Sequence, residues 1–149
     1  MPTDEARSGQ SVQASIDGAS LGNPGPAGIG VVLTDSRGSP IVQLSKYLGE
    51  TTNNVAEYLA LLYALQEAQR RGIRRLTVKT DSELLAKQLN GDYKVRDNTL
   101  RLFHDLARQW MQAFEQCLVE HISRTQNTQA DRLASDAVES RFDTSLKIV

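Results

Sequence analysis

The hydrophobic pattern of this chain changes once, near residue 51, and that change limits the folds open to it. Before it, short apolar or alternating segments are separated by Gly- and Pro-containing turns, as in a β-meander. These predicted strands cover residues 12–16, 29–33 and 41–48. After it, helical periodicity alternates with short strands. The predicted helices cover residues 54–71, 82–89, 99–115 and 128–141, and the strands cover residues 76–80 and 118–122.

The resulting order, βββαβααβα, predicts an α/β fold built on one mixed sheet of five strands. Strands joined by short turns pair antiparallel, whereas strands separated by a helix need a crossover and can pair in parallel. We therefore expect three antiparallel strands plus two parallel ones, flanked by helices. Thr52 or Asn53 is suited to cap the first helix, and Gly72 to end it.

The length of 149 residues fits one domain. We expect it to cover residues 11–143, with a flexible polar tail at residues 1–10 and a C-terminal tail at residues 144–149. No apolar run reaches the roughly 18 residues of a membrane span, and the N-terminus does not look like a secretory signal. The single Cys117 excludes an intrachain disulfide and suits a reducing cytosol, so we expect a cytoplasmic protein.

One carboxylate stands out within the first predicted helix. Glu57 is the only charged residue between Asn54 and Gln66, and its surroundings, VAEYLALLYAL, are apolar around nearly the whole helix. Such a helix is buried on most sides. A buried carboxylate has to be paired, bound to a metal or neutralised. A buried ion pair or a protonated acid would explain Glu57 as well as a functional site would.

Three further acids occupy positions where a site could form. Asp17 ends the first predicted strand, Asp81 ends the fourth, and Asp131 lies in the first turn of the last helix. In sheets with helical crossovers, ligands gather at the carboxyl ends of strands. Taken singly, Asp17 could be a turn residue and Asp131 an acid favoured by the helix dipole.

Together these four acids would repel one another unless cations bind between them. Carboxylate oxygens are hard ligands that suit Mg²⁺ or Mn²⁺ rather than zinc. Two such ions about 4 Å apart can activate a water and stabilise the leaving oxygen in phosphodiester hydrolysis.

Four segments carry a resemblance to a known family. They are IDGASLGNPGPAGIG around Asp17, TTNNVAEYLAL around Glu57, TDSELLAKQLNG after Thr80 and NTQADRLA around Asp131. In this order and spacing, the chain resembles type 1 ribonuclease H over roughly residues 11–142. The resemblance implies the ribonuclease H-like fold and an endonuclease that hydrolyses the RNA strand of RNA/DNA hybrids.

The resemblance also implies roles for individual residues. Two Mg²⁺ or Mn²⁺ ions would be held by the four acids: Asp17 would bridge them, Glu57 and Asp81 would flank the first, and Asp131 would complete the second. Glu57 would lie near the ribose 2′-hydroxyl, which distinguishes RNA from DNA. The implied hybrid-binding residues are Gly18, Asn23, Thr52, Asn53, Asn54 and Ser82.

The basic residues give a weaker indication of substrate binding. The net charge is −1, so any nucleic acid would be attracted by local patches rather than by the whole molecule. Lys94 and Arg96 in the segment NGDYKVRDNT are the predicted phosphate contacts, with Lys87 and Arg101 as further candidates. A solvated basic face explains them nearly as well. We expect modest, salt-sensitive affinity and a monomer.

The chain departs from the family at one position of the expected site. Many members carry a histidine in a loop shortly before the last acid, whereas the loop here is SRTQN, with Arg124 as its cation. Arg124 is therefore the possible substitute for the histidine. His121 is placed on the fifth strand as a structural residue, and His104 on a solvated helix face. A non-catalytic hybrid-binding module, or a nuclease of the same fold acting on DNA or junctions, remains an alternative function.

Overall fold

The computed structural model describes residues 11–141, and the predicted tails at residues 1–10 and 144–149 lie outside the described residues. Within that range the order of elements is the one predicted, βββαβααβα, with one additional 3₁₀ turn, η1. The elements are β1 (Ser11–Ser20), β2 (Gly25–Thr34), β3 (Pro40–Thr51), α2 (Asn53–Arg70), β4 (Arg75–Thr80), α3 (Glu83–Leu89), α4 (Asn98–Met111), β5 (Gln116–His121), η1 (Arg124–Gln126) and α5 (Thr128–Ser140).

The strands form one mixed sheet in the order β3-β2-β1-β4-β5. β1 pairs antiparallel with β2, and β2 with β3, whereas β4 runs parallel to both β1 and β5. The parallel ladder between β1 and β4 ends at the pair Ile16 and Thr80. The next residue along each chain segment is an acid, Asp17 or Asp81, so the two acids lie beside one another where the parallel ladder ends. Asp81 follows β4, whereas the expectation that Asp17 ends its strand is wrong, because β1 continues to Ser20 in its pairing with β2.

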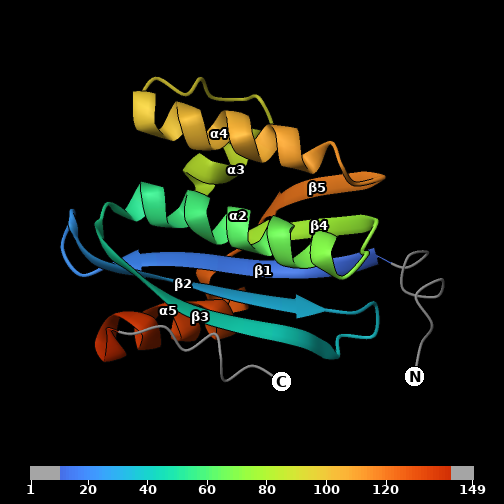
Figure 1. Cartoon of the computed structure of the whole chain (residues 1–149), viewed down its shortest axis with the longest axis horizontal. Helices are drawn as coiled ribbons and strands as arrows, with labels where there is room; N and C mark the ends of the chain where they lie inside the picture. The colour runs from blue at the N-terminus through green and yellow to red at the C-terminus, as the bar shows by residue number, and fades with distance from the viewer. Residues whose placement is uncertain (1–10, 142–149) are drawn as a thin grey trace.

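Helices cover the sheet on both faces, and Figure 1 shows α2, α3 and α4 on one side and α5 on the other. Val12, Ala14 and Ile16 alternate along β1 and join the core that α2 seals. A residue in a strand faces the opposite side from its neighbours. Asp17, which follows Ile16, therefore points toward the layer that contains α5.

The first helix begins where its sequence predicts. Thr52 is the N-cap, and its hydroxyl accepts a hydrogen bond from the Val55 N–H at 3.2 Å. Nine residues of α2 are buried, so only a small part of the helix surface is polar, as the apolar sequence implies. The helix therefore lies firmly against the sheet and presents its first turn at the edge where β1 ends.

One predicted helix is shorter than its amphipathic pattern suggests. The pattern extends to residue 115, whereas α4 ends at Met111. The N–H groups of Ala113 and Phe114 bond the carbonyls of Trp110 and Met111, so the chain turns there. Phe114 still reaches the core from this turn. The chain has to reverse direction to enter β5, and that requirement overrides the helical periodicity.

Gly30 on β2 allows α5 to lie unusually close to the sheet. A β-carbon at this position would lie 2.1 Å from the carbonyl oxygen of Ala130 and 2.8 Å from the nitrogen of Ala134. Gly30 is also the antiparallel partner of Asp17 in the sheet. The missing side chain thus permits the approach that brings Asp131, one residue after Ala130, toward Asp17.

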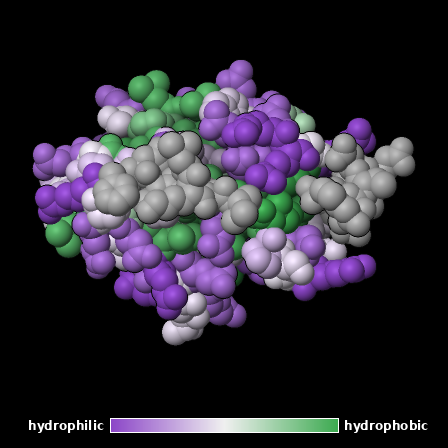
Figure 2. All heavy atoms as spheres, turned by 60° about the horizontal axis from the view of Figure 1, so that its bottom comes forward, coloured by the Kyte–Doolittle hydropathy of each residue, from purple (hydrophilic) through white to green (hydrophobic). Residues whose placement is uncertain are grey.

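Polar side chains cover much of the surface formed by the described residues. Figure 2 shows mainly hydrophilic side chains between smaller apolar areas on the face that it presents. No helix between residues 11 and 141 has the length and apolar character needed to cross a bilayer.

Candidate active site

Three carboxylates converge where the parallel ladder between β1 and β4 ends. Asp17 comes from within β1, Asp81 directly follows β4, and Glu57 comes from the first turns of α2. One oxygen from each carboxylate lies within 4.8 Å of the others. Asp17 is 5% exposed, so the cluster is largely removed from water. Only oxygen ligands are present, which favours a hard divalent cation over zinc.

Gly18 brings β1 and α2 together at this point. Its N–H donates a hydrogen bond of 2.7 Å to Oε1 of Glu57. A β-carbon on Gly18 would lie 2.4 Å from the carbonyl carbon of Ala56 and 2.5 Å from the nitrogen of Glu57. Any larger residue would therefore push α2 away, and Glu57 would lose its place beside Asp17.

The electrostatics of the cluster are those of like charges held together in a dry environment. Burial, reinforced by the charges of Glu57 and Asp81, raises the pKa of Asp17 to about 9. Burial also raises the pKa of Glu57 to about 8, although the Gly18 N–H and the charge of Arg124 oppose that rise. Both shifts favour the protonated form of the carboxyl when no cation is bound. The carboxylates, their spacing and this repulsion therefore fit divalent metal ions.

Asp131 completes the set from the opposite layer. It is exposed in the first turn of α5 and lies outside the group of three carboxylates. A hydrogen bond with its side chain and its negative charge both contribute to the raised pKa of Asp17. The fourth predicted acid is thus next to Asp17 and open to solvent, where a second cation and a substrate could meet it.

Arg124 lies on η1, close enough to Glu57 for its positive charge to lower the pKa of that carboxyl. Arg124 is exposed to solvent. The loop cation is therefore directed toward the acids even though the histidine of many family members is absent. Neither of the two histidines of the chain belongs to this loop. His104 lies on α4, and His121 is exposed at the end of β5, where it pairs with Thr80 of β4.

Several of the predicted hybrid-binding residues form a network beside the acids. Asn23 Oδ1 accepts a hydrogen bond from the Asn53 N–H at 2.9 Å. Asn53 Oδ1 in turn accepts hydrogen bonds from the N–H and the hydroxyl of Ser20, at 2.9 and 3.1 Å. These exposed amides join the β1–β2 turn to the start of α2. Their free N–H groups are available to a ligand at the surface.

Thr52 and Ser82 have local roles that are compatible with ligand binding. Thr52 caps α2, and Ser82 caps α3 by accepting a hydrogen bond from the Leu85 N–H at 3.1 Å. Asn54 is exposed in the first turn of α2. The N-terminus of α2 therefore lies close to Glu57, and the N-terminus of α3 lies close to Asp81.

The structure separates the basic candidates into two groups. Lys94 and Arg96 are exposed in the connection between α3 and α4, as predicted. Arg101 instead donates from Nε and one terminal nitrogen to the carbonyl of Val95, at 3.3 and 3.1 Å. Lys87 contacts Glu83 at 3.5 Å and lies over the ring of Tyr93. Arg101 and Lys87 are thus engaged with this chain.

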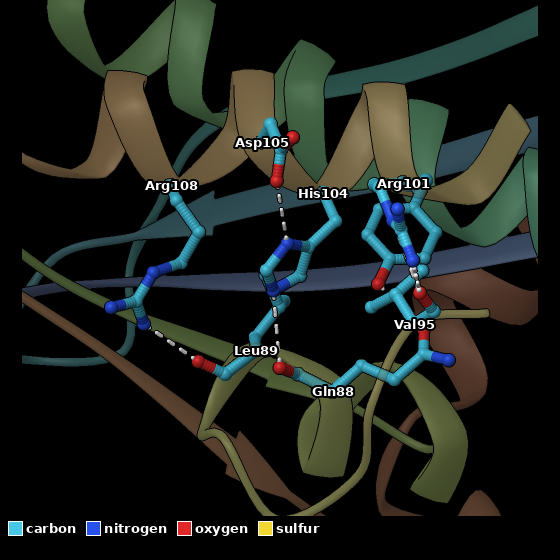
Figure 3. Close-up of polar contacts among 8 residues, drawn as sticks. Gln88, Leu89, Val95, Arg101, His104, Asp105 and Arg108 are labelled. Atoms are coloured by element: carbon cyan, nitrogen blue, oxygen red, sulfur yellow. Dashed lines mark hydrogen bonds and ion pairs between the residues drawn. The ribbon is translucent and has the colours of Figure 1, made fainter. Parts of the chain in front are cut away.

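The expected solvated face is exposed at Asp105 and Arg108, but His104 itself is half-buried. Its side chain is 21% exposed, with Nε2 at 3.2 Å from the carbonyl oxygen of Gln88 and Nδ1 at 3.2 Å from Asp105. Figure 3 shows Arg101, His104 and Arg108 all directed from α4 toward α3 and the loop that follows it. Arg108 donates to the carbonyl of Leu89 at 2.8 Å. The helical pattern places these residues on the outside of α4, but α3 and its loop lie against that side.

Asn127 is a residue near the acids that the sequence analysis did not single out. It is 1% exposed and its amide contacts Asp81. Its position at the start of a helix suggests an ordinary N-cap, yet its side chain makes no capping bond. The sequence feature that could have identified Asn127 is its position at the start of the segment NTQADRLA, four residues before Asp131.

The mixed sheet in this strand order, with the carboxylate cluster beside β1 and β4, is that of a ribonuclease H-like domain. Residues 15–137 match a protein-family model described as "Reverse transcriptase-like", and the chain belongs to that family, as a ribonuclease H-like domain.

Relatives of known structure agree with this membership. Ribonuclease HI of Halobacterium salinarum is 39% identical over 131 residues, which are 88% of this chain and 66% of the relative. The crystal structure of ribonuclease H1 from that archaeon superposes with a TM-score of 0.85 at 38% identity, covering 87% of this chain and 98% of the crystallised one. A crystal structure of LC11-RNase H1 in complex with an RNA/DNA hybrid gives a TM-score of 0.84 at 39% identity, covering 87% and 98% of the two chains.

Other relatives are much longer than this chain. A bifunctional protein of Mycobacterium tuberculosis is 39% identical over 130 residues, which are 87% of this chain but only 36% of that protein. The chain thus spans about a third to two thirds of the length of these curated relatives. The match fixes the family of the domain.

Proposed function

We propose that this protein is an endoribonuclease that hydrolyses the RNA strand of RNA/DNA hybrids with the help of two Mg²⁺ or Mn²⁺ ions. The observation that carries the proposal is the convergence of Asp17, Glu57 and Asp81, one oxygen of each lying within 4.8 Å of the others. Bound cations would activate a water and stabilise the leaving oxygen during phosphodiester hydrolysis. The relative whose structure contains an RNA/DNA hybrid supports the choice of substrate.

The residues of the chain divide the work according to their positions. Asp17, Glu57 and Asp81, together with Asp131 beside Asp17, would hold the two cations. The Gly18 N–H keeps Glu57 fixed at 2.7 Å, so the carboxylate does not have to reorganise when a cation binds. Glu57 also lies where it can recognise a ribose 2′-hydroxyl.

The hybrid lies over the exposed residues around the acids. Asn23, Asn53, Asn54 and Thr52 contact its minor groove and phosphates, while Gly18 and Ser82 allow close approach of the scissile strand. Lys94 and Arg96 contact phosphates farther from the cleaved bond, and this contribution weakens with salt. Arg124 supports proton transfer or product departure in place of the missing histidine.

The protein acts as a monomer in the reducing cytosol. Its single cysteine, Cys117, is half-buried on β5, and burial raises the pKa of its thiol to about 11. Such a thiol is a poor nucleophile and a poor partner for disulfide exchange. Size-exclusion chromatography with light scattering measures the mass in solution, and a dimer would contradict this part of the proposal.

A cleavage assay with three substrates tests the activity. Labelled RNA/DNA hybrid, duplex DNA and duplex RNA are incubated with Mg²⁺, with Mn²⁺ or with EDTA, and products are resolved on a denaturing gel. We expect cleavage of the RNA strand of the hybrid only, and only with metal. Tight hybrid binding without product would show a binding module, and cleavage of duplex DNA would show a different nuclease.

The variant Asp17→Asn tests the site itself. It keeps the shape of the side chain but removes the charge that holds cations, so we expect the loss of metal-dependent cleavage with the fold intact. Asp136→Asn, at an exposed acid of α5 outside the cluster, is the matched control and keeps full activity. Wild-type cleavage by Asp17→Asn would refute the mechanism.

A further inference from the structure

Asn127 connects the elements that carry three of the four acids. It lies between η1 and α5 and is almost fully buried. Its Nδ2 group donates to the carbonyl oxygen of Ile16 at 2.8 Å and to Oδ2 of Asp81 at 3.4 Å. Its own carbonyl accepts the N–H of Asp131 at 3.1 Å. One residue thereby joins β1, the end of β4 and the first turn of α5.

The chemistry of these contacts fixes the orientation of the amide. A backbone carbonyl and a carboxylate only accept hydrogen bonds, so both require the Nδ2 side of Asn127. The opposite orientation would place Oδ1 against two other oxygens. In the observed orientation Oδ1 is buried and has no partner among the described residues. An unpaired buried acceptor costs free energy. The reason for an amide at this position therefore lies in its two donated bonds.

The position of the two acceptors supplies that reason. Ile16 and Thr80 form the last pair of the parallel ladder, and Asp17 and Asp81 follow them directly. Beyond this pair the two strands no longer hold one another by backbone bonds. The Asn127 amide spans the point where they separate. It fixes the backbone just before Asp17 and one oxygen of Asp81, so that the other oxygen of Asp81 stays free for the cluster.

We propose that Asn127 is a positioning residue that sets the relative placement of Asp17 and Asp81 for cation binding. The inference rests on the proposed metal-dependent cleavage. Asn127 contacts Asp81 and the backbone carbonyl of Ile16, and it acts through these two groups. Hydrogen-bond partners of metal ligands typically contribute about tenfold to hundredfold to metal affinity or activity. We expect a loss of that size when the amide is removed.

The first test compares Asn127→Ala with a matched amide that has no acid partner. Asn90 donates from Nδ2 to the carbonyl of Val119 in β5 at 3.2 Å, so Asn90→Ala removes the same kind of bond away from the acids. We measure kcat, KM for the hybrid and the Mg²⁺ concentration for half-maximal rate. Asn127→Ala should lower kcat and raise the Mg²⁺ requirement by about tenfold or more, with KM nearly unchanged. Asn90→Ala should leave the Mg²⁺ requirement at the wild-type value.

A second variant guards against a merely structural effect. Asn127→Gln keeps the amide donor on a side chain that is one methylene longer, so it should recover part of the Mg²⁺ affinity that Asn127→Ala loses. Calorimetry on each folded variant measures the affinity for Mg²⁺ alone, so the effect of the substitution is detected without any substrate. An unchanged Mg²⁺ affinity in both Asn127 variants, or an equal loss in Asn90→Ala, would overturn the proposal.

The wild-type protein provides a test that does not depend on any variant folding. In ¹⁵N-edited NMR spectra, the Asn127 side-chain amide should exchange slowly and shift when Mg²⁺ is added, because its partner Asp81 is a cation ligand. The Asn90 side-chain amide should not shift. No shift of Asn127 at saturating Mg²⁺ would refute its positioning role. Absence of hybrid cleavage by an Mg²⁺-loaded wild type would instead refute the proposed function, so the two failures are distinguishable.

Discussion

Two carboxylates on the same helix show how surroundings decide the role of a residue. Glu67 on α2 is 9% exposed and contacts Arg70 at 3.5 Å and Arg71 at 3.3 Å, so it is neutralised by ion pairs. Glu57 lies next to Asp17 and Asp81 and is held by the Gly18 N–H. The ion-pair explanation thus applies to Glu67, whereas Glu57 faces like charges.

This contrast predicts opposite effects of the same substitution. Glu57→Gln keeps an oxygen for the Gly18 N–H but removes charge from the cluster, so the melting temperature without metal should rise. Cleavage should fall by at least about 100-fold, as for the loss of one preorganised group in an active site. Glu67→Gln should lower the melting temperature slightly and leave cleavage unchanged. Differential scanning calorimetry with EDTA and the hybrid assay measure both quantities, and a fall in stability for Glu57→Gln would contradict the account.

The raised pKa values of Asp17 and Glu57 predict how stability depends on pH without metal. Their usual values of 3.8 and 4.5 apply to the unfolded chain, and about 9 and about 8 to the folded one. Between these limits the folded protein binds more protons than the unfolded chain, so the free energy of unfolding should fall as pH rises from about 4 to about 9. Urea denaturation at several pH values in EDTA checks the slope. Saturating Mg²⁺ should flatten it, and a rise in stability over this range would disprove the raised pKa values.

At the scale of the elements, packing decides which cations remain free. α4 lies against α3 and the following loop, and Arg101, His104 and Arg108 donate to or contact groups there (Figure 3). These contacts close one side of a pocket of about 410 Å³ between α3 and α4. The exposed Arg96, in the same connection, has no such role. Basic residues close together in the sequence thereby acquire different functions.

Arg101→Ala and Arg96→Ala should therefore separate stability from hybrid binding. Arg101→Ala should cost on the order of 1 kcal/mol of stability, because the Val95 carbonyl loses its donor, and should change hybrid affinity little. Arg96→Ala should leave stability unchanged and reduce the slope of log affinity against log salt concentration by about one. Thermal melts and binding at several salt concentrations, with the inactive Asp17→Asn background, provide the measurements. A reduced salt slope for Arg101→Ala would show that it contacts phosphate.

At the scale of the whole molecule, the acidic cluster lowers the stability of the folded chain. Asp17, Glu57 and Asp81 repel one another, and the packing of the hydrophobic core has to outweigh that repulsion. The net charge of −1 is small, so this local concentration of charge, rather than the total, dominates. Stability and metal binding are consequently linked.

Mg²⁺ or Mn²⁺ should raise the melting temperature of the protein. A ligand that binds only the folded state stabilises it by about 2.7 kcal/mol at 100 times its dissociation constant. Scanning calorimetry over a titration of each metal measures the rise, and Ca²⁺-free EDTA buffer gives the baseline. The Asp17→Asn variant should show a much smaller rise. An unchanged melting temperature in wild type at saturating metal would contradict a preformed cation site.

The sequence by itself determined the elements and their order, because hydrophobic periodicity, caps and turn residues are local properties. Strand and helix order, the Thr52 cap and the position of Asp81 after β4 follow from such signals. The end of α4 at Met111 did not, because the reversal into β5 depends on where the sheet lies.

Only the tertiary structure decided which side chains meet. The bond between Asn127 and Ile16 joins residues 111 positions apart, and no local pattern encodes it. The same holds for His104 against Gln88 and for the approach of α5 to Gly30. Four acids could be recognised from their motifs, but their spacing, their protonation and their support by Asn127 depend on burial and on contacts between distant segments. These properties arise only when the sheet and its two helical layers pack together.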